Sequence, residues 1–530
     1  IPMPATCYPR PVSSRLRPLL HLSLMLGLSA SPLFVAPSWA EDGARRHYQV
    51  PAGSLGNALT RFAGLAGVNL SVDPALVSGR SSTGLSGEYA VEEGFARLLQ
   101  GSGLQLQPVG EQAYILTPAP EGSSLQLAPT SILGAADGAQ GEVFAGGQVA
   151  RRGSQGLLGS RDFMETPFSM TTYTSEVVKN TQARTLGDLI STDPSVRATN
   201  PAGGRYEQFT IRGFSLFNSD VAYNGLYGIL PTYSIDMEMA DRVDIIKGPS
   251  QLINGISPRG SVGGGINVVP KRALAQDLTR FTADYASNAQ GGGHLDVSRR
   301  FGTDEQFGVR FNGSHHQGDT AVDKQSRTAD VGALSLDYQG ERFKATLDLI
   351  SQQEEFDAPS RPFLVAAGVA VPSAPDGQNN VTQQWAWSKI NDRSAMLRTE
   401  YELSDKLALF ANVGAAHTEV SRLSDQTPTI LNAAGDTTAT PMHFKFDIER
   451  FTADAGARAR FDTGPVRHAV TLQASTYRDQ LARGSTSGTA VLSNIYSPVD
   501  SPSQNVSAPS LVPKVSETTL SGVALADTLS

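Results

Sequence analysis

The second half of the chain consists largely of short runs in which apolar and polar residues alternate. Successive side chains of a β-strand point to opposite faces, so each run predicts a strand with one apolar face and one polar face. The apolar sets are Phe281/Ala283/Tyr285, Leu295/Val297/Phe301, Phe307/Val309/Phe311, Phe343/Ala345/Leu347/Leu349, Ala395/Leu397/Tyr401/Leu403, Leu407/Leu409/Ala411/Val413 and Val470/Leu472/Ala474.

The connections between these runs alternate regularly in length. A transmembrane antiparallel barrel has this rhythm, because its short turns face one compartment and its long loops face the other, with lipid around the wall. A soluble β-sandwich is the alternative, but it would show the alternation without the rhythm. We therefore predict part of a membrane-spanning barrel over 273–530. Short turns are expected at 302–305, 339–341, 404–406 and 463–465, and long polar loops at 316–328, 353–392, 419–443 and 481–514.

The N-terminus predicts export from the cytoplasm. Three arginines precede a broken apolar stretch at 19–35, and Ala40 ends a small-residue cleavage motif. Residues 1–40 are therefore predicted to be a secretory signal peptide, whereas a membrane anchor helix is less favoured because the stretch is short and interrupted. The single cysteine, Cys7, lies inside this segment, so we expect no disulfides or cysteine metal sites in the rest of the chain.

Charge and motif content exclude several functional classes. The formal net charge of −8 argues against a nucleic-acid partner, which would require a basic face. The glycine-rich segments 248–255 and 260–265 lack the spacing of phosphate-binding and dinucleotide-binding loops. His315-His316 could suggest a metal, but no spaced carboxylate or third histidine accompanies the pair, so a solvated pair is favoured. We find no catalytic constellation and expect no enzyme.

Residues 45–118 predict a compact α/β domain. Apolar residues spaced three and four apart predict one helix from Leu55 to Ala66, and a second helix is predicted over 90–99. The segment, from VPAGSLGNAL to the closing YILTP, resembles the secretin/TonB N-terminal signalling domain along its whole length. The resemblance implies a periplasmic domain that contacts an anti-sigma regulator. A passive periplasmic module and a secretin subunit are the alternatives.

Residues 119–160 predict a linker, because they are rich in Gly, Ala, Ser and Gln and lack periodicity. The linker contains an extended apolar segment suited to strand addition at the edge of a partner's sheet. In position and pattern it resembles a TonB box, the segment bound by the energy-coupling protein TonB; Glu142-Val143-Phe144 is the alternative. The candidate box comprises Leu127, Ala128, Pro129, Thr130, Ser131, Ile132, Leu133 and Gly134.

Residues 161–272 carry a second set of motifs. They include ETPFS at 165–169, a predicted helical turn at 184–190, IRGF at 211–214 in a predicted central strand, and a glycine-dense segment at 241–272. Such glycine density permits tight turns and close backbone approach. Together these motifs resemble the plug domain of TonB-dependent outer-membrane receptors, which implies an α+β domain inside a barrel.

The resemblance implies a barrel of about 22 strands, of which about ten are readable here. An open sheet edge cannot face hydrocarbon, and the strand-like sequence at 525–530 has no terminal aromatic residue, so we expect a C-terminal truncation. The predicted fold class is therefore mixed. It combines a small α/β signalling domain, an α+β plug domain and the first part of a transmembrane antiparallel β-barrel.

By resemblance, the function is import of a ferric siderophore across the bacterial outer membrane, with signalling through the periplasmic domain. The implied partners are TonB, an anti-sigma regulator, the siderophore and outer-membrane lipid; no cofactor is expected, since the chelator holds the iron. Alternatives are other cargo (haem, cobalamin or an oligosaccharide) and a sensory receptor without transport. A secretin-type pore would share 45–118 but lack 161–272. ETPFS and the signalling domain favour a siderophore.

Ferric chelates are held by aromatic rings and a few arginine or glutamine side chains, which plug apices and barrel loops supply in this family. For the tyrosines, packing between plug and wall is the alternative role. For the tryptophans the alternative is the aromatic girdle at the membrane interface. The candidate ligand-binding residues are Arg205, Tyr206, Tyr223, Tyr227, Tyr233, Trp385 and Trp387.

A buried arginine in a plug strand must be paired, because an isolated buried charge is costly. By resemblance, Arg212 would lock the plug to carboxylates of the barrel, in a structural or gating role. By resemblance, Arg272 shares that role with Asp241 and Asp244. The other candidate latch residues are Asp241, Arg242, Asp244 and Lys247.

Overall fold

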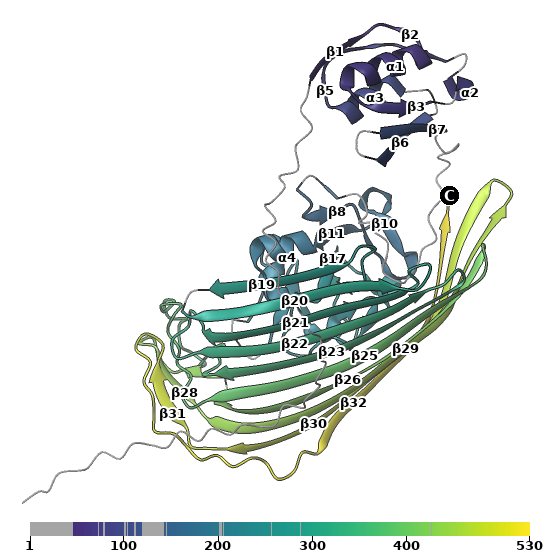
Figure 1. Ribbon diagram of the computed structural model, residues 1–530. Coiled ribbons are helices and arrows are strands. Elements are labelled where there is room, and N and C mark those ends of the chain that lie inside the picture. Colours follow the sequence, from purple (N-terminus) through teal and green to yellow (C-terminus); the bar gives the residue numbers. More distant parts are fainter. Residues whose placement is uncertain are drawn as a thin grey trace, which may run out of the picture. The chain divides into compact units, whose positions relative to one another are not determined.

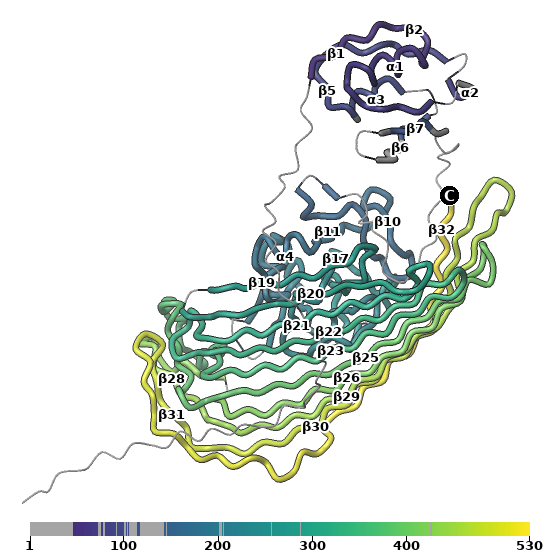
Figure 2. The backbone as a smooth tube through the Cα atoms, viewed as in Figure 1, coloured from purple at the N-terminus to yellow at the C-terminus, as the bar shows by residue number. Residues whose placement is uncertain are grey.

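A computed structural model describes residues 46–118 and 143–530, apart from 73, 78–79, 100–101, 103, 111–112, 145, 201–203, 205, 256, 287 and 426. The predicted signal peptide with Cys7, the candidate TonB box at 127–134, and Arg205 lie outside the described residues. The chain divides into two compact units after Leu127, and each is described by itself (Figures 1 and 2).

The first unit is a small α/β domain, as predicted. Its helix α1 (Leu55–Ala66) ends at Gly67, whose φ of 74° gives the left-handed cap that glycine adopts without strain. Helix α3 (Val91–Leu99) packs on α1. The remaining elements are β1 (Arg46–Val50), β2 (Gly53–Ser54), β3 (Asn69–Ser71), α2 (Pro74–Val77), β4 (Ser81–Ser82), β5 (Leu85–Tyr89), β6 (Leu104–Gly110) and β7 (Ala113–Pro118), paired as β1-β5, β2-β4 and β3-β7-β6.

An aromatic cluster holds this domain together. Phe62 of α1 is fully buried, and its ring centroid lies 4.7 Å from that of Tyr48 and 4.8 Å from that of Phe95. Gly94 of α3 lies against the same ring: a Cβ at this position would be 2.1 Å from Cζ of Phe62. The absence of a side chain at Gly94 therefore sets how closely the two helices approach.

The second unit begins with the plug, whose elements enclose one hydrophobic core. Strand β17 (Ala240–Lys247) and strand β18 (Gly264–Pro270) pair antiparallel. They lie in a sheet ordered β16-β15-β18-β17-β11-β8, beside a second sheet ordered β12-β13-β14. The other elements are β8 (Val149–Ala150), β9 (Arg152–Ser154), η1 (Gly156–Leu158), β10 (Ser160–Asp162), η2 (Phe163–Glu165), β11 (Ser169–Thr174), α4 (Ser175–Thr181), α5 (Leu186–Ile190), β12 (Val196–Ala198), β13 (Gln208–Ile211), β14 (Phe214–Phe217), η3 (Asn218–Asp220), β15 (Val221–Tyr223), β16 (Leu226–Tyr227) and α6 (Gln251–Asn254).

Two features of the plug differ from the sequence-based expectations. The IRGF motif was expected in a central strand, but Arg212 and Gly213 form the two-residue turn between β13 and β14, with φ of 51° and 88°. A positive φ at both central residues matches the twist of a tight hairpin. Residues 149–160, expected in the linker, form β8, β9, η1 and β10. Strands of two or three residues are too short for periodicity to reveal.

Ten long antiparallel strands form one curved sheet around the plug, in agreement with the predicted number (Figure 1). The short turns fall where they were predicted, and pieces of the long loops form a further sheet, β24-β27-β28-β31. The wall strands are β19 (Leu278–Ala286), β20 (Gln290–Phe301), β21 (Phe307–Asp319), β22 (Ser326–Gln339), β23 (Phe343–Asp357), β25 (Trp387–Ser404), β26 (Leu407–Asp425), β29 (Pro441–Thr463), β30 (Val466–Ser487) and β32 (Lys514–Leu529); those of the loop sheet are β24 (Leu364–Val365), β27 (Thr429–Ile430), β28 (Asp436–Ala439) and β31 (Val491–Asn494).

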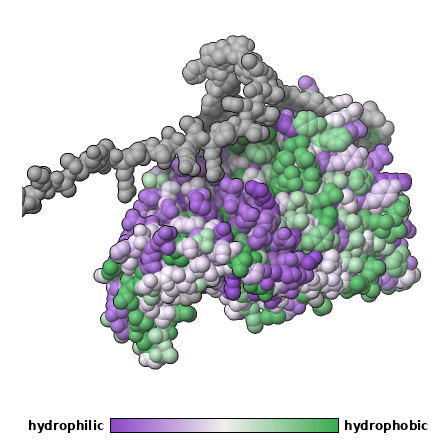
Figure 3. All heavy atoms as spheres, turned by 90° about the horizontal axis from the view of Figure 1, so that it is seen from below, coloured by the Kyte–Doolittle hydropathy of each residue, from purple (hydrophilic) through white to green (hydrophobic). Residues whose placement is uncertain are grey.

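The two faces of the wall differ as the alternation predicted. Apolar side chains of one parity remain exposed on the outer face, and patches of hydrophobic surface are visible in Figure 3. Side chains of the other parity are polar, and many are buried against the plug. No helix in the described part of the chain is long and apolar enough to cross a membrane. The outer set includes Phe281, Leu295, Phe311, Leu349, Leu397, Val413, Phe451 and Leu472, and the inner set includes Asp296, Arg310, Asp348, Arg398, Asn412 and Asp454.

The contact between Gly94 and Phe62 gives a test of the first unit. Gly94→Ala is expected to lower its free energy of unfolding by about 1–3 kcal/mol, because the methyl group overpacks the core. Gly64→Ala is the matched control, since a Cβ there meets no atom within 4 Å. On helix propensity alone it should stabilise by about 0.5–1 kcal/mol. Urea unfolding of a fragment spanning 46–118, followed by circular dichroism, measures both; stabilisation by both substitutions would contradict the packing.

Candidate functional site

The plug core continues into the wall of the sheet. Ala333, Ile350 and Met396, from three different strands, belong to the same buried cluster as the plug's own apolar residues. The wall and plug therefore share a packed interface, which we call the seam.

Buried charge pairs join one side of the plug to the wall. Arg272, at the end of the plug, forms a bidentate ion pair with Asp348 of β23, and the exposed fractions of their side chains are only 5% and 2%. Lys271 lies 3.2 Å from Asp296 of β20, and Arg184 lies 2.6 Å from Asp284 of β19. Because breaking a buried pair leaves an uncompensated charge, these contacts resist partial displacement of the plug.

A neighbouring segment of the plug is held through its backbone. Arg450 of β29 donates to the carbonyl of Leu230 at 3.1 Å, and Gln352 of β23 donates to that of Ser234 at 3.0 Å. Thr232 meets Asp392 through its backbone N–H at 3.1 Å, and its hydroxyl lies 2.8 Å from that of Thr418. A loop spanning residues 224–234 is therefore fixed to the wall at several points.

The predicted latch residues on β17 pair within the plug instead. Lys247 lies 2.9 Å from Asp193, and Arg242 lies 3.6 Å from Asp244 and 3.7 Å from Asp241. Asp244 also accepts a hydrogen bond of 2.9 Å from the hydroxyl of Thr172.

Arg212 was expected to be buried and paired, but its side chain is exposed. Its place at the tip of a hairpin explains the difference, since both central residues of such a turn lie outside the sheet. Of the sequence-based latch set, Arg272 alone reaches the wall in the described residues. The sequence did not indicate the seam pairs formed by Arg184, Lys271, Asp296 and Asp348. The only available signal was the polar set of alternate positions on each wall strand, which point inward.

Aromatic and cationic side chains meet where the plug loop containing Tyr233 faces the wall near the long loops. The guanidinium of Arg422, on β26, lies 4.9 Å from the ring centroid of Tyr233 and 5.4 Å from that of Phe446. Phe356, Ile390 and Val420 form the apolar cluster on which Tyr233 and Phe446 pack. Arg422 is only 2% exposed, whereas Tyr233 and Phe446 are half-buried, so a ligand arriving from outside would meet the two rings before the guanidinium. We call Tyr233, Arg422 and Phe446 the apical cluster.

The other tyrosine candidates have different surroundings. Tyr223 is only 2% exposed and belongs to the plug core, so packing accounts for its position. Tyr227 is half-buried, and burial followed by the negative charge of Asp220 raises its pKa well above the ordinary value. Tyr206 is half-buried near the plug apex, where its carbonyl accepts a hydrogen bond of 3.0 Å from Asn200. The structure brings only Tyr233 into the apical cluster.

The two tryptophans do not lie in the apical cluster. Trp385 donates to the carbonyl of Ser501 at 3.0 Å and thereby links two long loops. Trp387 opens β25 on the outward parity, with its ring 5.5 Å from that of His443. This orientation favours the membrane-interface role over ligand contact for Trp387.

Glu207 is a buried plug carboxylate with a raised pKa. Its carboxylate accepts hydrogen bonds from the backbone N–H groups of Gly187 at 3.1 Å and Ile235 at 3.2 Å. Burial outweighs these bonds and raises the pKa of Glu207 to about 7. Glu207 thus connects α5 to the loop that carries Tyr233.

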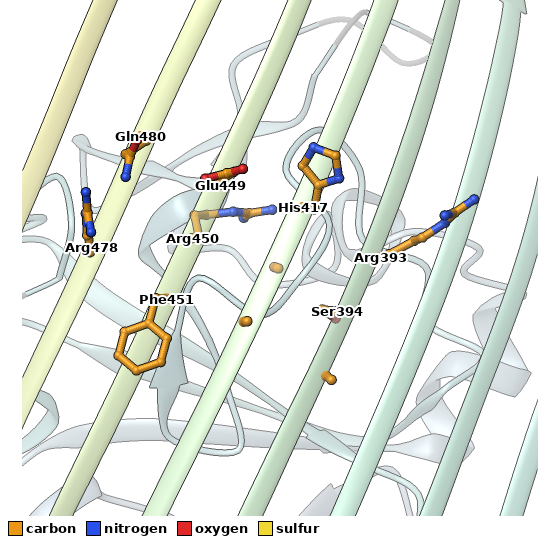
Figure 4. A pocket seen from close by; sticks show the side chains of 11 residues that line it. Arg393, Ser394, His417, Glu449, Arg450, Phe451, Arg478 and Gln480 are labelled. Carbon is orange, nitrogen blue, oxygen red and sulfur yellow. The ribbon is translucent and has the colours of Figure 1, made fainter. Parts of the chain in front are cut away.

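A depression of about 550 Å³ lies on the wall, but on its outward face. Arg393, His417 and Glu449 lie side by side on neighbouring strands at its rim, and Phe451 lies beside them (Figure 4). Their parity is that of the lipid-facing residues, so this depression does not open toward the plug. We therefore do not assign it to the ligand.

Comparison with known proteins identifies both units. Residues 162–264 match the TonB-dependent Receptor Plug Domain, and residues 68–119 match the Secretin and TonB N terminus short domain. The ferrichrome receptor FcuA of Yersinia enterocolitica is 35% identical over 393 residues, covering 73% of this chain and 52% of that receptor. The ferric-pyoverdine BN7/BN8 receptor of Pseudomonas putida is 30% identical over 292 residues, covering 54% and 36%.

Among solved structures, BauA, the ferric preacinetobactin receptor of Acinetobacter baumannii, superposes with a TM-score of 0.70 at 36% identity. The match covers 73% of this chain and 59% of BauA. The chain thus contains a TonB-dependent receptor plug domain and a secretin/TonB N-terminal short domain, and its fold matches that of BauA over 73% of its length. These relatives are named as receptors rather than enzymes. The chain spans about half, or less, of the length of the curated relatives named here.

The charge pairs at the seam predict an asymmetric response to substitution. Arg272→Ala leaves Asp348 buried without its partner and should destabilise the protein by about 3–5 kcal/mol. Lys389→Ala is the control, because its pair with Glu355 at 2.8 Å has exposed fractions of 52% and 58%. Such a pair is worth about 0–1 kcal/mol. The apparent Tm in detergent micelles compares them, and equal Tm values would show that the seam pair does not hold the plug.

Proposed function

We propose that this chain belongs to a receptor that imports a ferric siderophore and signals through its periplasmic domain. The apical cluster carries the proposal, because it places a cation between two aromatic rings at the boundary of plug and wall. The relatives that support it are named as receptors for ferrichrome, ferric pyoverdine and ferric preacinetobactin. A ferric hydroxamate of the ferrichrome type is the first cargo to test, given the 35% identity to FcuA.

In this proposal the chelate binds from outside against Tyr233, Arg422 and Phe446. The chelator supplies the ligands of the iron, and the protein supplies ring faces and a guanidinium. Binding would bear on the same loop that Arg450, Asp392 and Thr418 attach to the wall. Occupancy can therefore bias the position of the loop without any covalent step.

Energy coupling would act at the linker. TonB would bind the segment 127–134 by strand addition and pull on the plug against the buried pairs of the seam. The N-terminal domain would report occupancy to an anti-sigma regulator in the periplasm. Residues 161–272 would form the plug and residues 273–530 the first part of the barrel, with 45–118 as the signalling domain.

The linker gives a test of transport. A strain lacking this receptor, carrying the complete gene, should grow under iron restriction when one class of ferric siderophore is supplied. Deleting 127–134 should abolish that rescue and leave binding intact, because the deletion removes the TonB contact and not the apical cluster. Scrambling 135–141 in the same linker is the control and should preserve growth.

Failure of all siderophores with the receptor present in the outer membrane would contradict the siderophore assignment. Haem, cobalamin and oligosaccharides would then be tested in the same strain. Rescue that survives deletion of 127–134 would remove this segment as the TonB box and direct attention to Glu142-Val143-Phe144.

The apical cluster gives a test of binding. Arg422→Lys keeps the charge but loses the planar group that stacks between Tyr233 and Phe446, so the Kd for the rescuing siderophore should rise about tenfold or more. Arg393→Lys is the control, since it makes the same chemical change on the outward face of neighbouring strand β25. Fluorescence titration in detergent micelles measures both, and an unchanged Kd for Arg422→Lys would place the ligand elsewhere.

A further inference from the structure

The pair His315-His316 on β21 separates into two different environments. His315 faces outward, is exposed, and lies 2.7 Å from Asp330 of β22. His316 faces inward and is only 6% exposed. Its Nε2 atom lies 2.9 Å from a carboxylate oxygen of Asp284, on β19, and 3.6 Å from one of Glu238, on the plug. The carboxylates that the sequence around the histidines lacks are supplied by distant parts of the chain.

Strand register explains how His316 and Asp284 meet. Gly292 of β20 pairs with Asp284 on one side and with His316 on the other. A Cβ at position 292 would lie 2.1 Å from Cδ2 of His316, so any side chain there would occupy the space of the ring. Glycine at this position lets two side chains from non-adjacent strands approach each other across β20.

The surroundings hold the donor atoms in place. Arg184 donates to Oδ1 of Asp284 at 2.6 Å and to Gln290 at 2.7 Å, which fixes the carboxylate and leaves Oδ2 directed at His316. Such outer contacts are typical around metal-binding carboxylates and histidines. Oε2 of Glu238 is buried and has no hydrogen-bond donor among the described residues.

No protein cation occupies this space in the described residues. Lys271 donates to Asp296 at 3.2 Å and to Asn312 at 3.1 Å, and it acts on Glu238 only through its charge. Glu238 and Asp284 thus face one histidine, with Arg184 behind Asp284. Two carboxylates and an imidazole that converge without an intervening cation form a donor set for a metal ion of intermediate softness.

We propose that Glu238, Asp284 and His316 bind a divalent zinc-type ion at the seam between plug and wall. The three donor atoms lie within 4.8 Å of one another. A tetrahedral ion with bonds of about 2.0–2.2 Å separates neighbouring donors by about 3.3–3.6 Å. The 3.6 Å between His316 and Glu238 matches this spacing, whereas the 2.9 Å between His316 and Asp284 is a hydrogen bond that the ion would replace and lengthen by about 0.4–0.7 Å. The fourth position would be filled by water or another small ligand.

This site would fasten the plug to the wall, because one ligand belongs to the plug and two belong to the wall. An ion bound only when the plug is seated stabilises that state by mass action. The inference concerns the seam and is independent of which cargo the receptor imports.

The test uses the untagged full-length receptor in detergent micelles, stripped with a chelator and titrated with Zn²⁺. We expect one saturable Zn²⁺ per chain by calorimetry and mass spectrometry, and a higher apparent Tm when Zn²⁺ is bound. Glu238→Gln and His316→Ala should weaken binding by at least about 10–100-fold. His315→Ala is the matched control and should bind as the unaltered protein does.

Glu238→Gln nearly preserves side-chain size, so it keeps the test valid if His316→Ala fails to fold. Replacing Zn²⁺ with Co²⁺ should give visible d–d absorption, lost in Glu238→Gln. The proposal is overturned if the unaltered receptor shows no saturable Zn²⁺ binding, if Glu238→Gln binds as tightly as it does, or if His315→Ala loses binding equally.

Discussion

Buried charge at the seam is the constraint on which the rest of this structure depends. A strand with lipid on its outer face must direct its polar residues inward, where Asp296, Arg310 and Asp348 are nearly inaccessible to water. Each needs a partner, because an isolated buried charge costs several kcal/mol. The plug supplies some of these partners through Lys271 and Arg272, which meet Asp296 and Asp348. The wall therefore requires the plug electrostatically as well as sterically.

Buried ion pairs between plug and wall add little net stability, but they strongly favour one position of the plug. Desolvation offsets much of the Coulomb attraction when an ion pair is buried. Separating the partners loses that attraction at once, but the lost hydration free energy is recovered only when water returns. A small displacement of Arg272 is thus opposed steeply, whereas complete withdrawal into water is opposed less. In the proposed coupling step, this distance dependence would keep the plug closed at rest and let it move under an applied pull.

The sequence predicted most of the architecture and little of the site. Period-two alternation located seven of the ten wall strands and the predicted short turns, because a lipid-facing surface constrains every second residue. Helix α5 was likewise readable from local pattern. The IRGF hairpin was misread because Arg212 replaces the Asn, Asp or Gly that usually signals a tight turn. The partners of Arg272 and His316 were invisible for another reason: they are set by strand register and by plug docking, and no local spacing encodes either.

Two neighbouring parts of the plug are attached by different chemistry, and this difference bears on the proposed coupling. Arg184, Lys271 and Arg272 form ion pairs with β19, β20 and β23, whereas the loop at 224–234 is held largely through its backbone groups. Hydrogen bonds to backbone carbonyls are individually weaker than buried ion pairs and re-form readily with water. In the proposed transport cycle, the segment that carries Tyr233 would therefore be the part of the plug that a ligand shifts, and the ion-paired part would be the one that is pulled. A ligand that contacts only the first part would report its presence without itself releasing the second.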